Sequence, residues 1–361
     1  MKTIKTTILC FLLAFLLPLT AQAQSAKILM EATSQTVLAE SNASARLPMA
    51  SVTKIMTAYV VLKNAELDEM VKIDGRSAGI EGSSMYLKAG QSVSVKDLLY
   101  GLMLVSGNDA AMALAIHVGG SVEGFVSMMN TTAKELQLHD TCFQNPSGLP
   151  DEGHYTSAYD FARLTCIALQ NSVFSEIVKT KTYAFGDTTL VNHNRLLREL
   201  DGCIGVKTGY TKASGRCLAS AVERDGVRLI CITLNCSDDW NVHKTLYETN
   251  FSRCERKKLL TEKEIYRVLK VAGGHDVAYY CEDAYGVVVD GNMDLVISES
   301  VPNFIYANKQ KGDVIGKAKV MISGKTVAES PLILDRDTRI LRKPVSKFKK
   351  FFQFILHLFG F

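Results

Sequence analysis

The pattern of apolar and polar positions predicts a β-hairpin near the start of the folded chain, followed by a helix. Two short apolar runs within residues 26–38 flank the polar stretch Thr33-Ser-Gln35, as two strands flank a turn. After Pro48, apolar residues recur every three or four positions, at Val52, Ile55, Met56, Tyr59 and Val60. This spacing places them on one face of a helix, which we expect to lie in the core.

Two more helices are expected in the middle of the chain. Residues 95–104 indicate the first of them. The second is expected to begin near Asp109 and to end at Gly119-Gly120, because glycine terminates helices.

A sheet is predicted beside these helices. The apolar segments 216–222 and 227–234 are joined across Arg224-Asp225-Gly226, and Asp-Gly is a strong hairpin signal. Residues 207–209 read as a further strand. An antiparallel sheet flanked by helices follows from these elements.

From about residue 257 the pattern changes to short alternating segments, which predicts a small all-β domain. The expected strands are residues 264–271, 276–280, 285–289, 295–297 and 314–321, separated by Gly, Asn and Asp. The predicted fold class is therefore α/β, of the α+β type. Its larger domain covers residues 24–256 and its C-terminal β domain covers residues 257–337.

The first residues have the pattern of a cleaved signal peptide. Lys2 and Lys5 precede an apolar run at residues 8–19, and Ala21-Gln-Ala23 supplies the small residues of a cleavage site. The run is shorter than the roughly 20 residues that span a bilayer, which disfavours a retained anchor. We therefore expect residues 1–23 to be removed on export.

The other end of the chain, residues 338–361, predicts a basic amphipathic helix. Its polar positions form one stripe, at Lys347, Lys350, Gln353, His357 and Gly360. Phenylalanine, isoleucine and leucine side chains occupy the opposite face. Such a helix is expected to lie in an anionic membrane surface; the alternative is that it packs on the protein's own core.

Composition limits the possible partners. The 361 residues, 47% of them hydrophobic, suffice for two packed domains. Basic residues without any acid follow Asp337, so the net charge of +4 belongs to the tail and leader, and the body is acidic. No basic stripe with interleaved aromatic residues occurs in the body, which argues against nucleic-acid binding.

Cysteine usage leaves the redox state open. Eight cysteines remain once Cys10 is removed with the leader, and an exported protein can pair them. Their spacing shows no metal-ligand cluster, and the sequence predicts no cofactor. Cys217 and Cys231 lie in apolar runs, so buried free thiols are the favoured interpretation.

Three short motifs provide the candidate chemistry, in the order Ser51-Val-Thr-Lys54, Ser106-Gly-Asn108 and Lys207-Thr-Gly209. They supply a hydroxyl nucleophile, a lysine one helical turn away, a second hydroxyl with an amide, and a cationic strand. These groups are required to open an amide through an acyl-enzyme. One motif alone is weak, since a second Ser-x-x-Lys begins at Ser346 without the others. Their combination predicts serine acyl-transfer chemistry.

These motifs and their surroundings resemble the serine D-alanyl-D-alanine carboxypeptidases, the low-molecular-weight penicillin-binding proteins. The similar stretches include Pro48-Met-Ala-Ser-Val-Thr-Lys-Ile-Met-Thr57, Gly82-Ser-Ser-Met-Tyr-Leu-Lys88, Leu102-Met-Leu-Val-Ser-Gly-Asn-Asp-Ala-Ala111, Asn145-Pro-Ser-Gly-Leu149, Gly153-His-Tyr-Thr-Ser-Ala-Tyr-Asp160 and Val206-Lys-Thr-Gly-Tyr-Thr211. Gly312-Asp-Val-Ile-Gly316 and Glu329-Ser-Pro-Leu332 extend the resemblance into the β domain. The resemblance implies a β-lactamase/DD-peptidase-like first domain.

The resemblance also implies roles for the catalytic groups. Ser51 would be the nucleophile, and Lys54 its general base. Lys54 must be neutral to act, so burial and the cation Lys207 should lower its pKa. Ser106 would relay the proton towards the leaving amine, and Asn108 would hold both Lys54 and the substrate amide.

The remaining motif residues are expected to bind the substrate. Lys207 and Thr208 would bind the terminal carboxylate of the peptide, and Gly209 would let the peptide backbone add along the strand edge. The backbone N–H groups of Ser51 and Tyr210 would form the oxyanion hole. His154 lies in a similar stretch but is expected to be structural, because a lysine base already fills the usual role of histidine.

The expected function is removal of the terminal D-alanine from the pentapeptide stems of peptidoglycan, on the outer face of the cytoplasmic membrane. β-Lactams would acylate Ser51. A class A β-lactamase is one alternative, but it needs a glutamate that activates water, and no Glu-x-x-x-Asn segment lies between Asn108 and Lys207. A catalytically idle wall scaffold is the other alternative, which the intact motifs disfavour.

Overall fold

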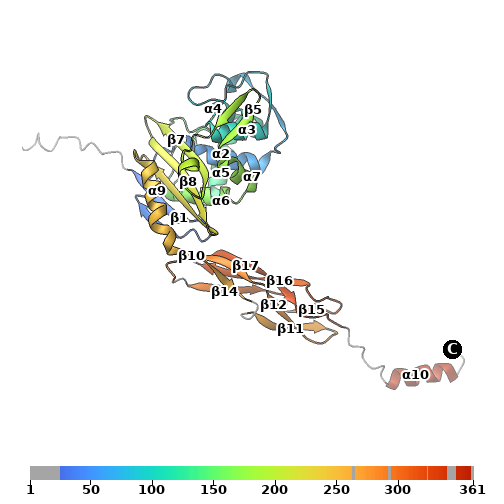
Figure 1. Ribbon diagram of the computed structural model, residues 1–361. Helices are drawn as coiled ribbons and strands as arrows, with labels where there is room; N and C mark the ends of the chain where they lie inside the picture. Colours follow the sequence, from blue (N-terminus) through green and yellow to red (C-terminus); the bar gives the residue numbers. More distant parts are fainter. Residues whose placement is uncertain (1–24, 262–264, 292–293, 323, 340–346, 359–361) are drawn as a thin grey trace, which may run out of the picture. The chain divides into compact units, whose positions relative to one another are not determined.

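The computed structural model describes residues 25–261, 265–291, 294–322, 324–339 and 347–358 (Figure 1). The predicted signal peptide, residues 1–23, lies outside the described residues. The chain forms two compact units, one extending to Thr249 and one from Asn250 onward, with the turn Asp225–Val227 grouped with the second. The second unit therefore begins before residue 257, where the sequence places the β domain.

The first unit is built on a five-stranded sheet with the strand order β2-β1-β9-β8-β7. Its strands are β1 (Ala26–Glu31), β2 (Val37–Ser41), β7 (Cys203–Thr211), β8 (Gly215–Arg224) and β9 (Val227–Leu234). Both hairpins predicted from the sequence are present. Asp225 and Gly226, at the β8–β9 turn, have positive φ values of 50° and 75°. Positive φ at both positions gives a two-residue turn whose twist matches that of the two strands it joins. β7 is an edge strand, so one side of it is open to other elements.

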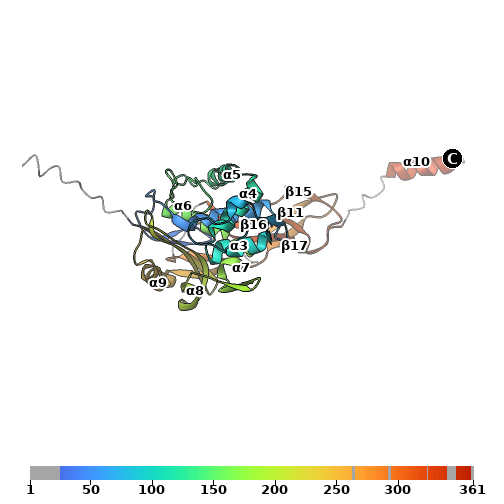
Figure 2. The same ribbon diagram turned by 90° about the horizontal axis from the view of Figure 1, so that it is seen from above.

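Helices cover both faces of this sheet. They are η1 (Ala50–Thr53), α2 (Lys54–Asn64), η2 (Gly75–Ser77), α3 (Val95–Leu104), α4 (Asn108–Gly119), α5 (Val122–Glu135), α6 (Ala158–Ala168), α7 (Ser172–Lys179), α8 (Leu196–Glu199) and α9 (Asp239–Asn250). Figures 1 and 2 show α9 on one side of the sheet and α2, α4, α5 and α6 on the other. The short strands β3 (Met70–Lys72), β4 (Ser92–Ser94), β5 (Thr182–Phe185) and β6 (Thr188–Val191) form two small hairpins at the periphery.

Alternating residues of the central strands divide the core between the two faces. Ala219 and Ala221 of β8 join the large cluster that includes α2. Ser220, between them, instead contacts His243 of α9 at 2.6 Å and Tyr247 at 2.8 Å. This period of two places successive strand residues on opposite faces.

Between Cys254 and Leu334 the second unit contains only strands among its described elements, as predicted for the β domain. Its larger sheet has the order β14-β16-β17-β12-β11-β15, and β10 pairs with β13. The strands are β10 (Cys254–Leu260), β11 (Tyr266–Ala272), β12 (Val277–Cys281), β13 (Ala284–Val289), β14 (Leu295–Ser300), β15 (Phe304–Tyr306), β16 (Val314–Ile322) and β17 (Lys325–Leu334), and η3 (Phe251–Arg253) precedes them. β10, β15 and β17 are not predicted from the sequence; the last contains Pro331, which is unusual inside a strand.

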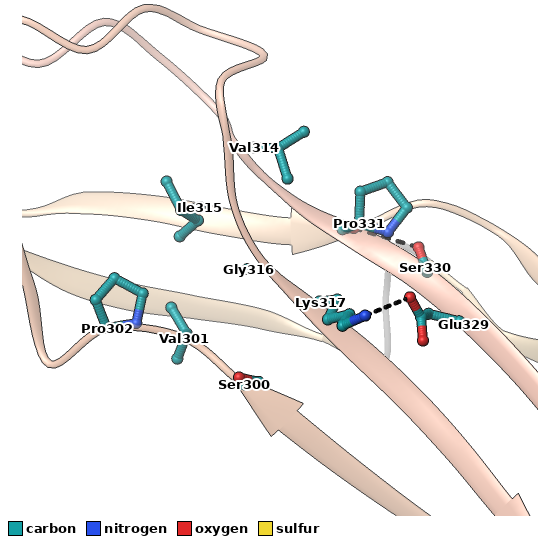
Figure 3. Close-up of a pocket in the computed structure, with 10 residues that line it drawn as sticks. All are labelled: Ser300, Val301, Pro302, Val314, Ile315, Gly316, Lys317, Glu329, Ser330 and Pro331. Atoms are coloured by element: carbon teal, nitrogen blue, oxygen red, sulfur yellow. Dashed lines mark hydrogen bonds and ion pairs between the residues drawn. The ribbon is translucent and has the colours of Figure 1, made fainter. Parts of the chain in front are cut away.

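An open groove of about 830 Å³ lies in this β unit (Figure 3). Apolar side chains such as Val301, Pro302 and Ile315 line it, and Lys317 pairs with Glu329 at 2.9 Å on its wall. None of the site residues predicted from the sequence lines this groove.

The segment expected to form a tail helix is α10 (Lys347–Leu358). Phe351, Phe354 and Leu358 are 58%, 63% and 67% exposed. Among the described residues, no single helix is both long and apolar enough to cross a bilayer; α4 and α5 meet that measure only as a pair bent by 84°. No disulfide joins the eight cysteines that the structure describes, and Cys166, Cys217, Cys231 and Cys281 are buried.

Candidate active site

Ser51 lies in the 3₁₀ turn η1, directly before α2. The turn is supported by Thr53, whose hydroxyl donates to the carbonyl of Ala50 at 2.8 Å. It also packs tightly on β7, since a Cβ atom built on Gly209 would lie 2.9 Å from the Ser51 nitrogen. The glycine that the sequence analysis assigned to substrate access thus also lets the edge strand approach the Ser51 backbone.

Lys54, one helical turn from Ser51, is fully buried at 0% exposure. Its Nζ lies 3.0 Å from Ser51 Oγ, 2.8 Å from Asn108 Oδ1 and 2.5 Å from the carbonyl oxygen of Ser147. Burial, and secondly the nearby Lys207 cation, hold the pKa of Lys54 well below its usual value. The structure thus brings together the serine and lysine that the first motif predicts.

The carbonyl of Ser147 is a contact that the sequence analysis missed. Asn145 orients it, because its Oδ1 accepts from the backbone N–H groups of Ser147 at 3.2 Å and Gly148 at 2.7 Å. Its Nδ2 donates to Leu149 at 3.0 Å. The sequence marks residues 145–149 only by their resemblance to the family, because the role of a backbone oxygen leaves no side-chain signal.

The second motif brings an amide and a hydroxyl to the same place. Asn108 accepts from Lys54 through Oδ1, and its Nδ2 donates to the carbonyl of Glu81 at 2.7 Å. Ser106 is only 4% exposed, and its backbone has a φ of 63°. Among the described residues its Oγ has no hydrogen-bond partner, although buried hydroxyls normally have one.

Asp109 anchors the loop that covers this motif. Its fully buried carboxylate accepts from the Ser84 hydroxyl at 2.6 Å and from the backbone N–H groups of Met85 at 3.1 Å and Leu87 at 3.0 Å. Gly82, in the same loop, has a φ of 90°, and a Cβ there would lie 2.9 Å from Asn108 Nδ2. The loop is therefore shaped to fit against Asn108.

Lys207 and Thr208 come from β7, as predicted. Lys207 is 1% exposed, and its Nζ donates to the backbone carbonyl of Thr208 at 2.8 Å. Burial lowers the pKa of Lys207 to about 7. The ammonium is thus held inside the protein beside the site.

A pocket of about 330 Å³ opens in front of Ser51. Of the residues predicted from the sequence, it is lined by Ser51, Ser106, Thr208, Gly209 and Tyr210. It is also lined by residues that the sequence did not assign to the site, namely Ser83, His193, Arg216, Cys217, Asp239 and Trp240. Arg216 lies opposite Tyr210 in the β7–β8 pairing, so only the strand register could have indicated it.

His154 has a structural position, in agreement with the expectation. Its Nδ1 accepts from the backbone N–H of Gln144 at 2.9 Å, so Nε2 carries the proton and donates to Thr53 Oγ1 at 2.8 Å. Burial lowers the pKa of His154 to about 4, which keeps the ring neutral near pH 7. This ring supports the turn that holds Ser51.

A serine hydroxyl within hydrogen-bond distance of a buried lysine amine is the arrangement found in serine hydrolases that use lysine as their base. Comparison with known proteins specifies the class further. The family model described as D-alanyl-D-alanine carboxypeptidase matches residues 17–238. The chain therefore belongs to the D-alanyl-D-alanine carboxypeptidase family and is an enzyme of that serine type.

Individual relatives agree with this family. The chain is 32% identical to the D-alanyl-D-alanine carboxypeptidase DacF of Bacillus subtilis, over 88% of this chain and 86% of the relative. It is 34% identical to DacC of Escherichia coli, over 85% and 82%. Penicillin binding protein 5 of Haemophilus influenzae has a similar solved structure, with a TM-score of 0.65 and 29% identity over 87% of this chain and 96% of that one.

Proposed function

We propose that this enzyme removes the terminal D-alanine from peptidoglycan stem peptides through an acyl-enzyme on Ser51. The observation on which the proposal rests is the set of three contacts around Lys54 Nζ. In the reaction, Ser51 Oγ attacks the carbonyl carbon of the penultimate D-alanine, and the peptide bond to the last D-alanine breaks. Water then hydrolyses the ester and restores the serine.

The contacts of Lys54 suit a neutral amine. A neutral amine has two N–H donors and one lone pair, and two of its three partners, the Asn108 and Ser147 oxygens, can only accept. Both N–H groups are then used, and the lone pair faces Ser51 Oγ at 3.0 Å. In this state the hydroxyl donates to the amine, which is the arrangement that a general base requires.

Ser106 is proposed to pass the proton to the leaving amine. Its buried hydroxyl lines the pocket and has no partner among the described residues, so it is free to bridge Lys54 and a bound substrate. The charge of Lys207, when protonated, is the second cause of the lowered pKa of Lys54, after burial.

The substrate is proposed to lie along β7. Thr208 lines the pocket near Ser51 and would contact the terminal D-alanine, and Gly209 leaves the strand edge accessible. The backbone N–H groups of Ser51 and Tyr210 would stabilise the oxyanion, each by about 2.7–4 kcal/mol by analogy with other serine enzymes. Penicillins would enter the same pocket and acylate Ser51, because their amide and carboxylate imitate the peptide end.

A membrane location is proposed from the tail. The exposed phenylalanines of α10 need an apolar environment, and the basic residues beside them would be attracted to anionic lipid by about 1 kcal/mol each. The enzyme would then work on the outer face of the cytoplasmic membrane.

The triple substitution Lys347→Glu, Lys349→Glu and Lys350→Glu tests this proposal. It should weaken binding to vesicles that contain anionic lipid, and the loss should be greatest at low salt. Unchanged binding would contradict the electrostatic part of this proposal.

One assay separates this function from its alternatives. The enzyme is incubated with an acetylated L-Lys-D-Ala-D-Ala tripeptide and, in parallel, with fluorescent penicillin. A carboxypeptidase releases D-alanine and keeps the penicillin label. A β-lactamase hydrolyses penicillin rapidly and releases no D-alanine, whereas a scaffold releases neither product. Either of these last two results would overturn the proposal.

A further inference from the structure

Arg216 forms part of the active-site pocket wall, at the end nearest the start of α9. It lies on β8 directly opposite Tyr210, and residues opposite each other in an antiparallel pair project to the same face. Thr208, two residues before Tyr210, shares that face. Arg216 therefore continues the surface that Thr208 and Tyr210 begin.

The guanidinium of Arg216 is held from one edge. Its Nε and Nη2 both donate to Oδ1 of Asp239, at 3.1 Å and 2.9 Å. The guanidinium carbon, Cζ, lies 5.6 Å from the centre of the Trp240 ring. The Asp239 side chain is 3% exposed and that of Arg216 is 40% exposed. Among the described residues no hydrogen bond occupies Nη1, so donors remain free on the exposed edge.

The charge of this group differs from that of Lys207. Arginine stays protonated at all working pH values, whereas burial lowers the pKa of Lys207 to about 7. The Lys207 amine donates to the Thr208 carbonyl, and Lys207 is not among the residues that line the pocket. A permanent cation with free donors in the pocket is thus provided by Arg216.

We propose that Arg216 binds the terminal carboxylate of the peptide substrate, a contact that the sequence analysis assigned to Lys207 and Thr208. The planar guanidinium matches a carboxylate in a two-point contact. Asp239 and Trp240 act as positioning residues, since they fix the orientation of this group. The inference rests on the proposed carboxypeptidase function, and it explains how the enzyme selects a free peptide end.

The test compares the acetylated L-Lys-D-Ala-D-Ala tripeptide with its C-terminal carboxamide. Arg216→Gln should lower kcat/KM for the acid about 10- to 100-fold, the range expected for a charge-assisted contact. Its kcat/KM for the carboxamide should stay within twofold of wild type. The preference for the acid should therefore collapse. An unchanged preference would contradict the proposal.

Matched variants distinguish recognition from misfolding. Arg195 also stacks on Trp240, at 4.9 Å, but does not line the pocket, so Arg195→Gln should keep the wild-type preference. Loss of the preference there as well would show a general effect of charge. Because Arg216→Gln leaves Asp239 buried without its partner, the double variant with Asp239→Asn removes both charges and should show the same collapse. Asp239→Asn alone should raise KM for the acid more than it lowers kcat.

A binding measurement keeps this inference separate from the proposed function. Trp240 is the only tryptophan in the chain, so its fluorescence reports ligands at this end of the pocket. In a Ser51→Ala background the acid tripeptide should bind about 10- to 100-fold more tightly than the carboxamide, and Arg216→Gln should remove that difference. If wild type released no D-alanine, the proposed function would fail, and this titration would still decide the role of Arg216. Equal affinities for acid and carboxamide would overturn it.

Discussion

Replacing Lys207 by methionine should change how the stability of the first unit depends on pH. The pKa of Lys207 is about 7 in the folded protein and has a normal value of 10.5. Between these values the unfolded chain binds more protons than the folded one, so stability rises with pH. From pH 7 to pH 9 this one group contributes a rise of about 2 kcal/mol.

Lys207→Met should remove that rise. The substitution also changes the packing and removes the bond to Thr208. Both effects change the free energy of unfolding equally at the two pH values, so they cancel in the comparison.

Urea unfolding followed by Trp240 fluorescence measures this effect, because the tryptophan lies in the first unit. Wild type should gain about 2 kcal/mol more than Lys207→Met between pH 7 and pH 9. Lys212→Met, at an exposed position, should behave as wild type. Parallel pH dependences for wild type and Lys207→Met would refute the assignment of a buried, weakly basic lysine beside the site.

Three further changes have defined outcomes. Lys54→Arg keeps the positive charge but cannot lose a proton, so penicillin acylation, measured by stopped-flow fluorescence, should slow about 10²- to 10⁴-fold; near-normal acylation would show that the lysine acts only by its charge. Gly209→Ala should slow acylation and destabilise the protein by about 1–3 kcal/mol in urea unfolding, because its Cβ would lie 2.9 Å from the Ser51 nitrogen. Gly75→Ala, with nothing within 4 Å, should do neither. Deletion of residues 346–361 should release active enzyme from membranes, and a truncated protein that still pellets with membranes would show that the tail is not the anchor.

Elements with a strong local signal could be predicted from the sequence. The predicted helix at residues 95–104 matches α3, which begins after Ser94, whose hydroxyl caps it by accepting from Asp97 N at 3.0 Å. α4 ends at Gly119, and Gly120 follows it in the left-handed conformation, as the paired glycines indicate. α9 was missed, because polar residues interrupt its apolar pattern.

The same distinction between local and non-local signals applies to the residues of the active site. Ser51 and Lys54 are one helical turn apart, so local spacing already places them together. Arg216 and Asp239 are separated by 23 residues, and they meet only because α9 packs beside β8. The Ser147 carbonyl is a backbone group and has no residue type of its own. The spacing of motifs therefore cannot predict contacts that are made by tertiary packing or by the backbone.

The most direct test of the proposed chemistry is to locate the covalent intermediate. Wild type, Ser51→Ala and Lys54→Arg are mixed with penicillin, quenched in acid and digested, and the labelled peptide is identified by mass spectrometry. The adduct should lie on Ser51 in wild type, be absent from Ser51→Ala, and form much more slowly in Lys54→Arg. An adduct on another residue, or a Ser51→Ala protein that is labelled and still releases D-alanine, would contradict the proposed mechanism.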